Sequence, residues 1–197
     1  MATSKTELIN KALTLVGANP VTSIDDDTNN ARIINRVYDI ALRSILSECK
    51  WNFATKRLLL VTVTDTLDWY DTGETYVYQK PSDSVRIFGT NDADAIWREE
   101  GDFIISDTAA LGVRYVQYVD NPDKYPASFI DAFSDRLCSD IAFMVLNSLS
   151  TGQTFQEKYE KVSLPKARAE NSQLGTQQTL KDDAWELAKS GNSSANS

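Results

Sequence analysis

The hydrophobic spacing of this chain changes twice, and these changes limit the folds that it can adopt. Apolar residues recur every three or four positions from about residue 8 to 45 and again from 129 to 162, which is typical of amphipathic helices. From residue 58 to 119, short runs rich in Val, Ile, Tyr and Phe are separated by Gly, Pro, Asn and Asp. The sequence therefore predicts an α+β fold, in which a small β module is inserted into an antiparallel helical bundle.

The first segment carries start and stop signals for two helices. Ser4 and Glu7 have the spacing of a capping box, in which each side chain satisfies a backbone N–H group. Gly17 supplies the left-handed residue that commonly ends a helix. Three carboxylates at 25–27 stand where they favour the N-terminus of a second, longer helix. We expect residues 1–57 to form a helical hairpin.

The middle segment, residues 58–120, predicts a small and mostly antiparallel β module. Runs of three to seven β-favouring residues, bounded by turn residues, are typical of short strands. Glu100-Gly101 separates two such runs and is expected to form a two-residue hairpin. The strands are expected at residues 58–63, 76–78, 85–88, 96–99, 102–105 and 113–119.

Residues 121–174 return to helical spacing and are expected to complete a bundle of four main helices. A long apolar helix over about 129–149 is expected to be the central core element. Gly152 is expected to break this helix, and a further helix is expected to start near Thr154. Pro165 is expected to kink or end that second helix, because proline lacks the N–H group that the helix needs.

The last segment, residues 175–197, is rich in Gln, Ser, Asn and Gly, and such a sequence cannot form a core alone. One short amphipathic stretch, residues 180–189, interrupts it. We expect an extended interaction tail, whose large apolar side chains anchor it to a partner: Leu180, Trp185 and Leu187.

The chain has 197 residues and contains no histidine. This excludes Ser-His and Cys-His nucleophilic pairs, histidine-based zinc sites and imidazole pH switches. The glycine loops that bind phosphate groups in nucleotide-binding proteins do not occur either. We therefore expect no catalytic residue, no cofactor and no metal centre, and hence no enzyme activity.

The two cysteines, Cys49 and Cys138, lie far apart in sequence and outside any CxxC motif. Buried free thiols are the expected state of both. No apolar stretch is long enough for a membrane span, and the N-terminus lacks the features of a signal peptide. We expect a soluble protein that is made in a reducing compartment.

The formal net charge is −8, from 20 basic and 28 acidic side chains, and the pI is near 4.6. Gripping nucleic acid usually requires a basic patch, because released counterions drive that binding, and no run of this chain is strongly basic. An acidic protein can still surround DNA when its task is to let the DNA slide past. The net charge therefore does not separate proteins that never meet DNA from proteins that guide it.

Two acidic clusters resemble metal sites, and the first lies before the second helix. Asp25-x-Asp27-x-Asn29 matches the opening of an EF-hand loop. The sixth and twelfth positions of that loop require glycine and glutamate, but they hold Asn30 and Arg36 here. Capping of the helix accounts for these carboxylates more simply.

The second acidic cluster consists of Asp65, Asp68 and Asp71 with Glu74. Carboxylates grouped in this way could bind Mg²⁺ in a metal-dependent nuclease. The stretch is also rich in Thr and lies beside Gly73, so turn chemistry accounts for it, and no basic residue lies nearby in sequence to hold a phosphate group. A nuclease is therefore the less favoured alternative.

The four tryptophans divide between core and surface. Trp51, at the end of a helix, and Trp97, in a strand, are expected to lie in the core. Trp69 lies in a loop and Trp185 in the polar tail, where neither has a core to enter. Large aromatic side chains in such places often anchor interfaces, so we expect these two to bind a partner.

Motifs that span residues 5 to 165 occur in a distinctive order. The first helices contain Asn10-Lys11-Ala12-Leu13, Gly17-Ala18-Asn19-Pro20-Val21, Asn30-Ala31-Arg32 and Trp51-Asn52-Phe53-Ala54. The β module contains Tyr76-Val77-Tyr78-Gln79-Lys80-Pro81-Ser82-Asp83-Ser84-Val85-Arg86-Ile87. The return to helix follows Val113-Arg114-Tyr115-Val116 and Asp120-Asn121-Pro122. Together these motifs resemble the head-to-tail adaptor family of tailed bacteriophages, also called tail tubular protein A in short-tailed phages.

The resemblance implies a structural virion protein in the neck or tail, synthesised in the host cytoplasm, and not an enzyme. It implies that copies form a ring, usually a dodecamer, beneath the portal protein. Such a ring continues the DNA channel and is the platform for the tail nozzle or the next tail component. Double-stranded DNA then passes through the lumen without sequence-specific binding, and no membrane is involved. The tail residues that we expect to contact the portal are Leu180, Trp185 and Leu187.

Two alternatives stay open. One is another neck or tail completion protein, which would bind tail components but have no affinity for the portal. The other is the metal-dependent nuclease that uses Asp65, Asp68 and Asp71.

Overall fold

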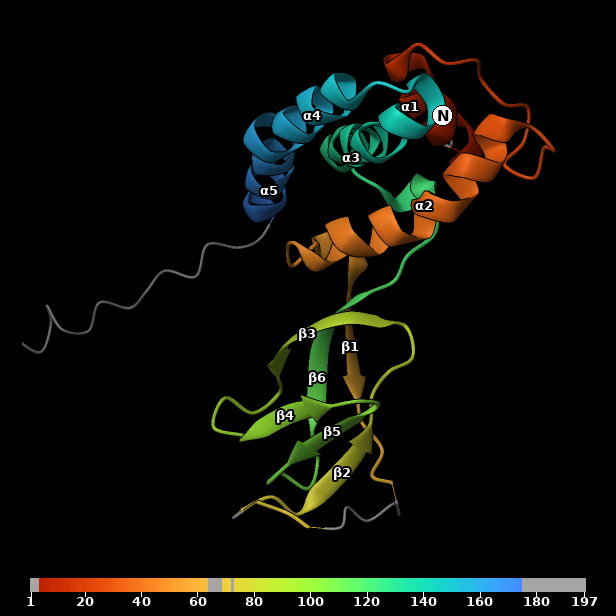
Figure 1. Ribbon diagram of the computed structural model, residues 1–197. Helices are drawn as coiled ribbons and strands as arrows, with labels where there is room; N and C mark the ends of the chain where they lie inside the picture. The colour runs from red at the N-terminus through yellow and green to blue at the C-terminus, as the bar shows by residue number, and fades with distance from the viewer. Residues whose placement is uncertain (1–3, 64–68, 72, 175–197) are drawn as a thin grey trace, which may run out of the picture.

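The computed structural model describes residues 4–63, 69–71 and 73–174 of the chain. Figure 1 shows a helical part with a β module beneath it. The helices are α1 (Lys5–Val16), α2 (Asn29–Ser47), α3 (Ala127–Leu146), α4 (Leu149–Lys158) and α5 (Leu164–Gln173). Short turns of 3₁₀ helix lie at Asn52–Ala54 and Pro122–Lys124, and a turn of π helix lies at Tyr159–Ser163.

The central element of the helical part is α3, because α1, α2, α4 and α5 all pack against it. Its buried face includes Phe129, Phe133 and Leu137. The chain continues from α4 through the π turn into α5 without a break, so the described residues form four main helices. This confirms the predicted α+β fold with four main helices.

The caps of the first two helices follow the sequence signals with one exception. Ser4 and Glu7 form the predicted capping box, and Gly17 ends α1 with φ +81°. At the start of α2, the side chain of Thr28 accepts the cap hydrogen bond from Ala31, not one of the three aspartates before it. The nearest of these aspartates, Asp27, pairs instead with Arg32 in the first turn. Thr28, which directly follows the three aspartates, is therefore the cap of α2.

The β module consists of two small antiparallel sheets within the described residues. Sheet A has the strand order β1 (Thr55–Leu59), β6 (Gly112–Gln117) and β3 (Ser84–Thr90). Sheet B has the order β2 (Tyr76–Gln79), β5 (Phe103–Ser106) and β4 (Trp97–Glu100). Each neighbouring pair is antiparallel, so β1 and β3 are the edges of sheet A, and β2 and β4 are the edges of sheet B.

Two details of the β module differ from the prediction. The first strand runs over 55–59, not 58–63, and beyond it Thr62 makes an isolated bridge to Tyr78. The hairpin between β4 and β5 pairs Glu100 with residue 103, so its two-residue turn is Gly101-Asp102 and not Glu100-Gly101. The φ of Gly101 is +57°, a left-handed value that glycine adopts without the steric cost of a Cβ atom.

Two hydrophobic cores stabilise the molecule. The larger core fills the helical part and reaches into sheet A through Val116 and Val119. The smaller core lies inside the β module and includes Tyr78, Ile104 and Tyr115. Since the larger core contains Val116 of β6 and Val119 just after it, the helical part and the β module are packed together and not merely tethered.

The break between α3 and α4 lies at Asn147 and not at Gly152, which corrects the predicted boundary. Asn147 has a left-handed φ of +53°, and Ser148 caps α4 by accepting a hydrogen bond from the N–H of Thr151. Gly152 lies inside α4, where an added Cβ atom would be 3.2 Å from the carbonyl oxygen of Ser139 in α3. Glycine therefore lets two helices approach each other here, although its helix propensity is low.

Pro165 stands in the first turn of α5, directly after the π turn. The π turn interrupts the regular α-helical ladder, so the missing N–H group of proline is tolerated. Asp135 of α3 supports this turn, because its carboxylate is 2.9 Å from Lys158 Nζ and also accepts a hydrogen bond from the Ser163 hydroxyl. Asp135 is only 2% exposed, so a buried charge is paired at the bend.

Candidate interaction surfaces

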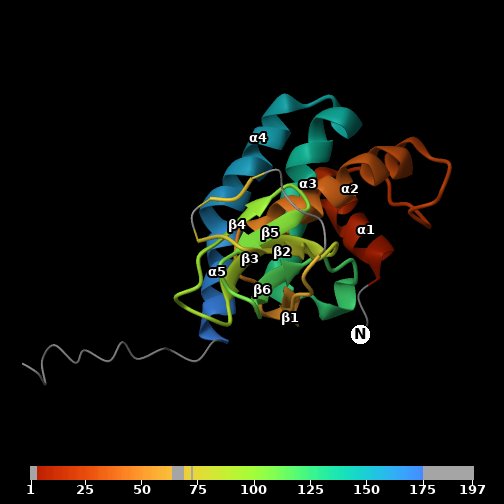
Figure 2. The same ribbon diagram turned by 90° about the horizontal axis from the view of Figure 1, so that it is seen from below.

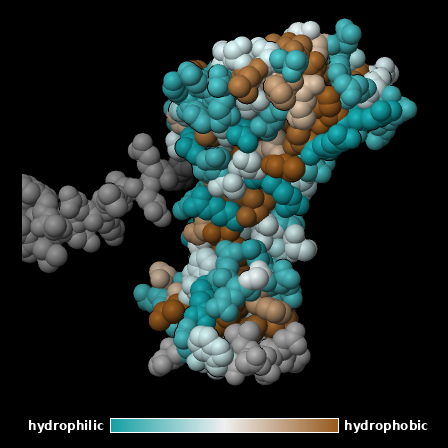
Figure 3. Space-filling model, in the orientation of Figure 1, coloured by the Kyte–Doolittle hydropathy of each residue, from teal (hydrophilic) through white to brown (hydrophobic). Residues whose placement is uncertain are grey.

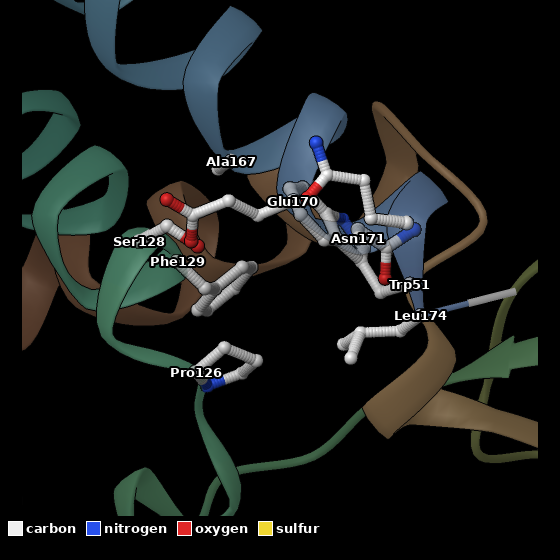
Figure 4. Close-up of a pocket in the computed structure, with 9 residues that line it drawn as sticks. Trp51, Pro126, Ser128, Phe129, Ala167, Glu170, Asn171 and Leu174 are labelled. Atoms are coloured by element: carbon white, nitrogen blue, oxygen red, sulfur yellow. The ribbon is translucent and has the colours of Figure 1, made fainter.

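A cavity of about 270 Å³ opens beside the last turn of α5. It lies between α5, the start of α3 and the segment that follows α2. Figure 4 shows Leu174 facing Pro126 and Phe129 across this cavity, with the carboxylate of Glu170 near Ser128. The lining residues are Trp51, Pro126, Ser128, Phe129, Ala167, Glu170, Asn171, Gln173 and Leu174.

Aromatic side chains form the inner wall of this cavity. Trp51 is 1% exposed, and its Nε1 donates a hydrogen bond of 2.8 Å to the carbonyl oxygen of Ile45 at the end of α2. The Trp51 and Phe129 rings meet edge to face with centroids 4.9 Å apart, and Phe53 contacts both. Packing of this kind holds the wall rigid, and it confirms the prediction that Trp51 belongs to the core.

Asn171 fastens α5 to the segment after α2. Its amide nitrogen donates to the Lys50 carbonyl oxygen at 3.0 Å, and its amide oxygen accepts from the Asn52 N–H at 2.8 Å. The Asn52 amide nitrogen donates in turn to the Asn171 carbonyl oxygen at 2.7 Å. These hydrogen bonds fix the position of the helix end from which residues 175–197 continue.

The cavity is suited to an apolar side chain with a basic or hydrogen-bonding group beside it. Its floor is aromatic, Leu174 at the rim is 72% exposed, and Glu170 supplies the carboxylate. The residues that we expect to contact the portal (Leu180, Trp185 and Leu187) lie outside the described residues. The same holds for the rest of the expected interaction tail.

A second surface lies where α3 ends and α4 begins. Phe143, Met144 and Leu149 are 55%, 43% and 64% exposed, and Leu146 is 39% exposed. On the face drawn in Figure 3, hydrophobic side chains gather over this part of the helices. The helical spacing had predicted that Met144 and Leu149 continue the core face, but the buried residues of α3 end at Ala142. Exposed apolar side chains next to each other commonly mark a protein interface.

The second acidic cluster is organised around an arginine. Arg98 Nη2 is 3.0 Å from Glu74 and Arg98 Nε is 2.7 Å from Glu100, and the same guanidinium pairs with Asp71. These ion pairs raise the pKa of Arg98, first through the hydrogen bond to Asp71. A guanidinium thus pairs with the described carboxylates of this cluster, Asp71 and Glu74, while Asp65 and Asp68 lie outside the described residues.

The first acidic cluster serves the loop before α2. The Asp26 carboxylate accepts hydrogen bonds of 2.8 and 2.9 Å from the N–H groups of Thr22 and Ser23, and Asp27 pairs with Arg32. These contacts shape the turn and the first helical turn. In the ranges that the structure describes, no group of three or more Cys, Asp or Glu side chains is arranged to hold a metal ion.

The other tryptophans and the cysteines divide by burial. Trp97 is partly buried and packs on the core of the β module, whereas Trp69 is 68% exposed. Both cysteines are free thiols; Cys138 is buried and Cys49 is only partly buried. Burial raises the pKa of Cys138 to about 12 and also raises the pKa of Cys49, where Arg168 partly offsets the effect. Neither thiol is therefore activated as a nucleophile.

Sequence reasoning missed two arginines that sheet A brings together. Arg57 of β1 and Arg114 of β6 are direct cross-strand partners, although 57 positions separate them in sequence. Neither makes an ion pair with a carboxylate among the described residues. The signal for Arg114 was a charged residue between the apolar Val113 and Tyr115, a pattern that predicts an outward-facing strand position, and Arg114 is the exposed residue between two buried ones.

None of the helices in the described ranges is long and apolar enough to cross a membrane. Neither a comparison with protein-family models nor a search of curated proteins found a match for this chain.

Proposed function

We propose that this protein is a head-to-tail adaptor of a tailed bacteriophage, a structural virion protein without enzymatic activity. Copies would form a ring, usually of twelve, beneath the portal protein, and the tail nozzle or the next tail component would bind to its far side. The proposal starts from the ordered motifs over residues 5–165 that resemble this family.

The observation that carries the proposal is the exposed apolar corner between α3 and α4. Phe143, Met144 and Leu149 are each more than 40% exposed and lie outside the larger core. Covering such side chains by association removes apolar surface from water, at about 25 cal/mol per Å². A subunit that packs its helices against neighbouring copies has this property, and a monomeric enzyme does not need it.

The charge of the chain fits a channel. With a net charge of −8, the protein repels the phosphate backbone, so double-stranded DNA can pass without being trapped. The cavity beside α5 fits the role expected of residues 175–197, because an apolar anchor from a partner or from a neighbouring copy can enter it. The protein would then reside in the virion neck, after synthesis in the host cytoplasm.

The first test is negative-stain electron microscopy of the full chain mixed with the portal protein of the same phage. The expected result is a second ring stacked coaxially beneath the portal. A bare portal beside a folded and monomeric protein would contradict the adaptor function. Binding to tail components without affinity for the portal would instead support another neck or tail completion protein.

The second test is truncation after Leu174. We expect the helical part and the β module to stay folded, because their cores lie within residues 4–174, and we expect attachment to the portal to be lost. Circular dichroism checks the fold, and microscopy checks the attachment. Attachment that is unchanged by the truncation would show that the tail residues are not the portal contact.

The nuclease alternative has its own test. Incubation of DNA with the protein and Mg²⁺ is expected to leave the DNA intact. Cleavage that disappears when Asp65, Asp68 and Asp71 are all replaced by alanine would support the nuclease and oppose a purely structural role.

A further inference from the structure

Two edge strands of opposite charge lie on different sheets of the β module. The edge strand β1 contains Lys56 and Arg57 followed by two leucines, and all five of its residues are exposed. The edge strand β4 ends with Glu99 and Glu100, which are also exposed. Figure 2 shows β1 and β4 at opposite margins of the module. Exposed edge strands are ready templates for pairing with another chain.

The backbone of β1 has free hydrogen-bonding groups at defined positions. The Leu60 N–H donates to the Leu111 carbonyl oxygen at 2.9 Å, which makes this a hydrogen-bonded pair of the β1–β6 ladder. Hydrogen-bonded and non-hydrogen-bonded pairs alternate along an antiparallel ladder. The N–H and C=O groups of Arg57 and Leu59 therefore point away from β6, toward the open edge of the sheet.

The same reasoning applies to β4. The Asp107 N–H donates to the Ile96 carbonyl oxygen at 3.2 Å, so the even-numbered residues of β4 bond to β5. The N–H and C=O groups of Trp97 and Glu99 then point outward. Each open edge thus has two residues, two positions apart, whose backbone N–H and C=O groups point outward.

At the β1 edge, Lys56 pairs with Asp83 at 2.9 Å, but Arg57 makes no ion pair among the described residues. Arg57 faces Arg114 across a non-hydrogen-bonded pair, in which side chains lie closest, and like charges opposite each other are unfavourable. The Arg114 guanidinium lies across Gly89, 3.5 Å from where a Cβ atom would stand. Two guanidinium groups therefore share one face of sheet A, with Leu59 beside them at 64% exposure.

We propose that β1 of one copy pairs with β4 of the next copy as neighbouring antiparallel strands. Aligning the outward groups places Arg57 opposite Glu99, and the antiparallel direction then places Leu59 opposite Trp97. On the other face, Lys56, which pairs with Asp83, comes opposite Glu100, which pairs with Arg98. The register thus joins basic side chains to acidic ones and an exposed leucine to a tryptophan.

The occupant is a second copy of this chain, because this chain carries both complementary edges. The contact joins two different surfaces, so a pair of copies keeps one free β1 edge and one free β4 edge, and further copies can add until a ring closes. Glu99 already pairs with Lys80 at 2.6 Å but keeps 32% of its side chain exposed, and a carboxylate can accept from two donors. This inference rests on the proposed ring function, since it adds a second contact between neighbouring subunits to the apolar corner between α3 and α4.

The test is charge reversal at the two edges of the full chain. Arg57→Glu and Glu99→Arg are each expected to weaken self-association at least tenfold, and the variant that carries both is expected to regain it. The matched controls are Arg36→Glu on α2 and Glu157→Arg on α4, which make the same charge changes at exposed helix positions. Circular dichroism verifies that each variant is folded.

Association is measured by sedimentation equilibrium of the protein alone and by counting rings assembled on the portal protein. Loss in both single variants with recovery in the double variant supports the pairing, provided that rings on the portal, where they form, respond in the same way. Equal association of all variants in both measurements would overturn the pairing. A wild-type protein that never associates would also overturn it and would mean that the charged edges prevent strand pairing. If rings form on the portal and neither charge reversal changes them, the pairing is wrong but the adaptor function stands. If the reversals weaken association in solution but no ring forms on the portal, the pairing stands and the adaptor function is wrong.

Discussion

At Gly152, α4 approaches α3 so closely that the residue has no room for a long side chain. We predict that Gly152→Leu lowers the free energy of unfolding by about 1–3 kcal/mol, the usual cost of overpacking. The reason is the 3.2 Å separation between an added Cβ atom and the Ser139 carbonyl oxygen, which is backbone and cannot turn aside. Urea denaturation measures the change.

The control for this substitution is Gln153→Leu, which adds an apolar side chain at an exposed position one residue along the same helix. It is expected to change the free energy of unfolding by less than about 0.5 kcal/mol. Equal effects of both leucines would mean that the loss arises from α4 itself and not from its packing on α3.

The two thiols are predicted to differ in reactivity. Because burial raises both pKa values, little thiolate is present in the folded protein at pH 8, and the thiolate is the species that reacts. We expect iodoacetamide to modify the partly buried Cys49 slowly and Cys138 far more slowly, with both reacting fast in urea. Peptide mass spectrometry over time measures the rates, and rapid labelling of Cys138 in the folded protein would contradict its burial.

At the scale of the elements, one carboxylate links the three strands of sheet A. Asp83, in the turn before β3, lies 2.9 Å from Lys56 Nζ of β1 and accepts a 2.9 Å hydrogen bond from the Tyr115 hydroxyl of β6. Although burial opposes the shift, these two hydrogen bonds lower the pKa of Asp83. One side chain thus links three strands.

We predict that Asp83→Asn lowers the free energy of unfolding at pH 7 by about 0.5–1.5 kcal/mol, a value kept small by solvent screening. A carboxylate whose pKa is lower in the folded state stabilises the fold above its unfolded pKa of about 3.9 and loses that effect as the pH falls through the folded value. The difference between wild type and variant should therefore shrink below about pH 4.

Thermal denaturation at several pH values measures this difference. Asp123→Asn is the control, because the Asp123 side chain is exposed and makes no ion pair in the described part of the chain. A difference that persists unchanged at pH 2 would mean that the ionised carboxylate does not hold the strands.

The elements that were predicted well are those whose signal is local. Capping boxes, left-handed glycines and short runs of β-favouring residues depend on neighbouring residues, and α1, β5 and β6 follow these signals. The strand β1 was misplaced because an edge strand exposed on both faces has no hydrophobic alternation to detect. The break at residue 147 was missed because Asn adopted the left-handed conformation expected of Gly152.

At the scale of the whole molecule, the helical part and the β module are predicted to unfold together. They share the larger core through Val116 and Val119, and the Arg86 side chain donates to the Ser47 carbonyl oxygen at 3.2 Å. We expect a single transition in guanidinium chloride, with the same midpoint by far-ultraviolet circular dichroism and by tryptophan fluorescence. Two separated midpoints would show that the β module unfolds on its own.

The candidate surfaces were less predictable than the fold. The residues of the α5 cavity come from positions 51, 126–129 and 167–174, which the bundle brings together over more than a hundred residues. The pairing of Asn171 with Asn52 joins two polar residues whose types carry no signal for each other. Arg57 and Arg114 became neighbours through strand register, a long-range property that composition does not encode.

The chain enters and leaves the β module at neighbouring points, since Thr55 and Val116 face each other across the β1–β6 ladder. Opposed residues in such a ladder have Cα atoms about 5 Å apart, so one or two residues could bridge the gap. An ancestor could have gained or lost the whole module at this place without rethreading the helices. The same geometry offers an engineer a graft site, where another small domain with adjacent ends could be presented from the helical part.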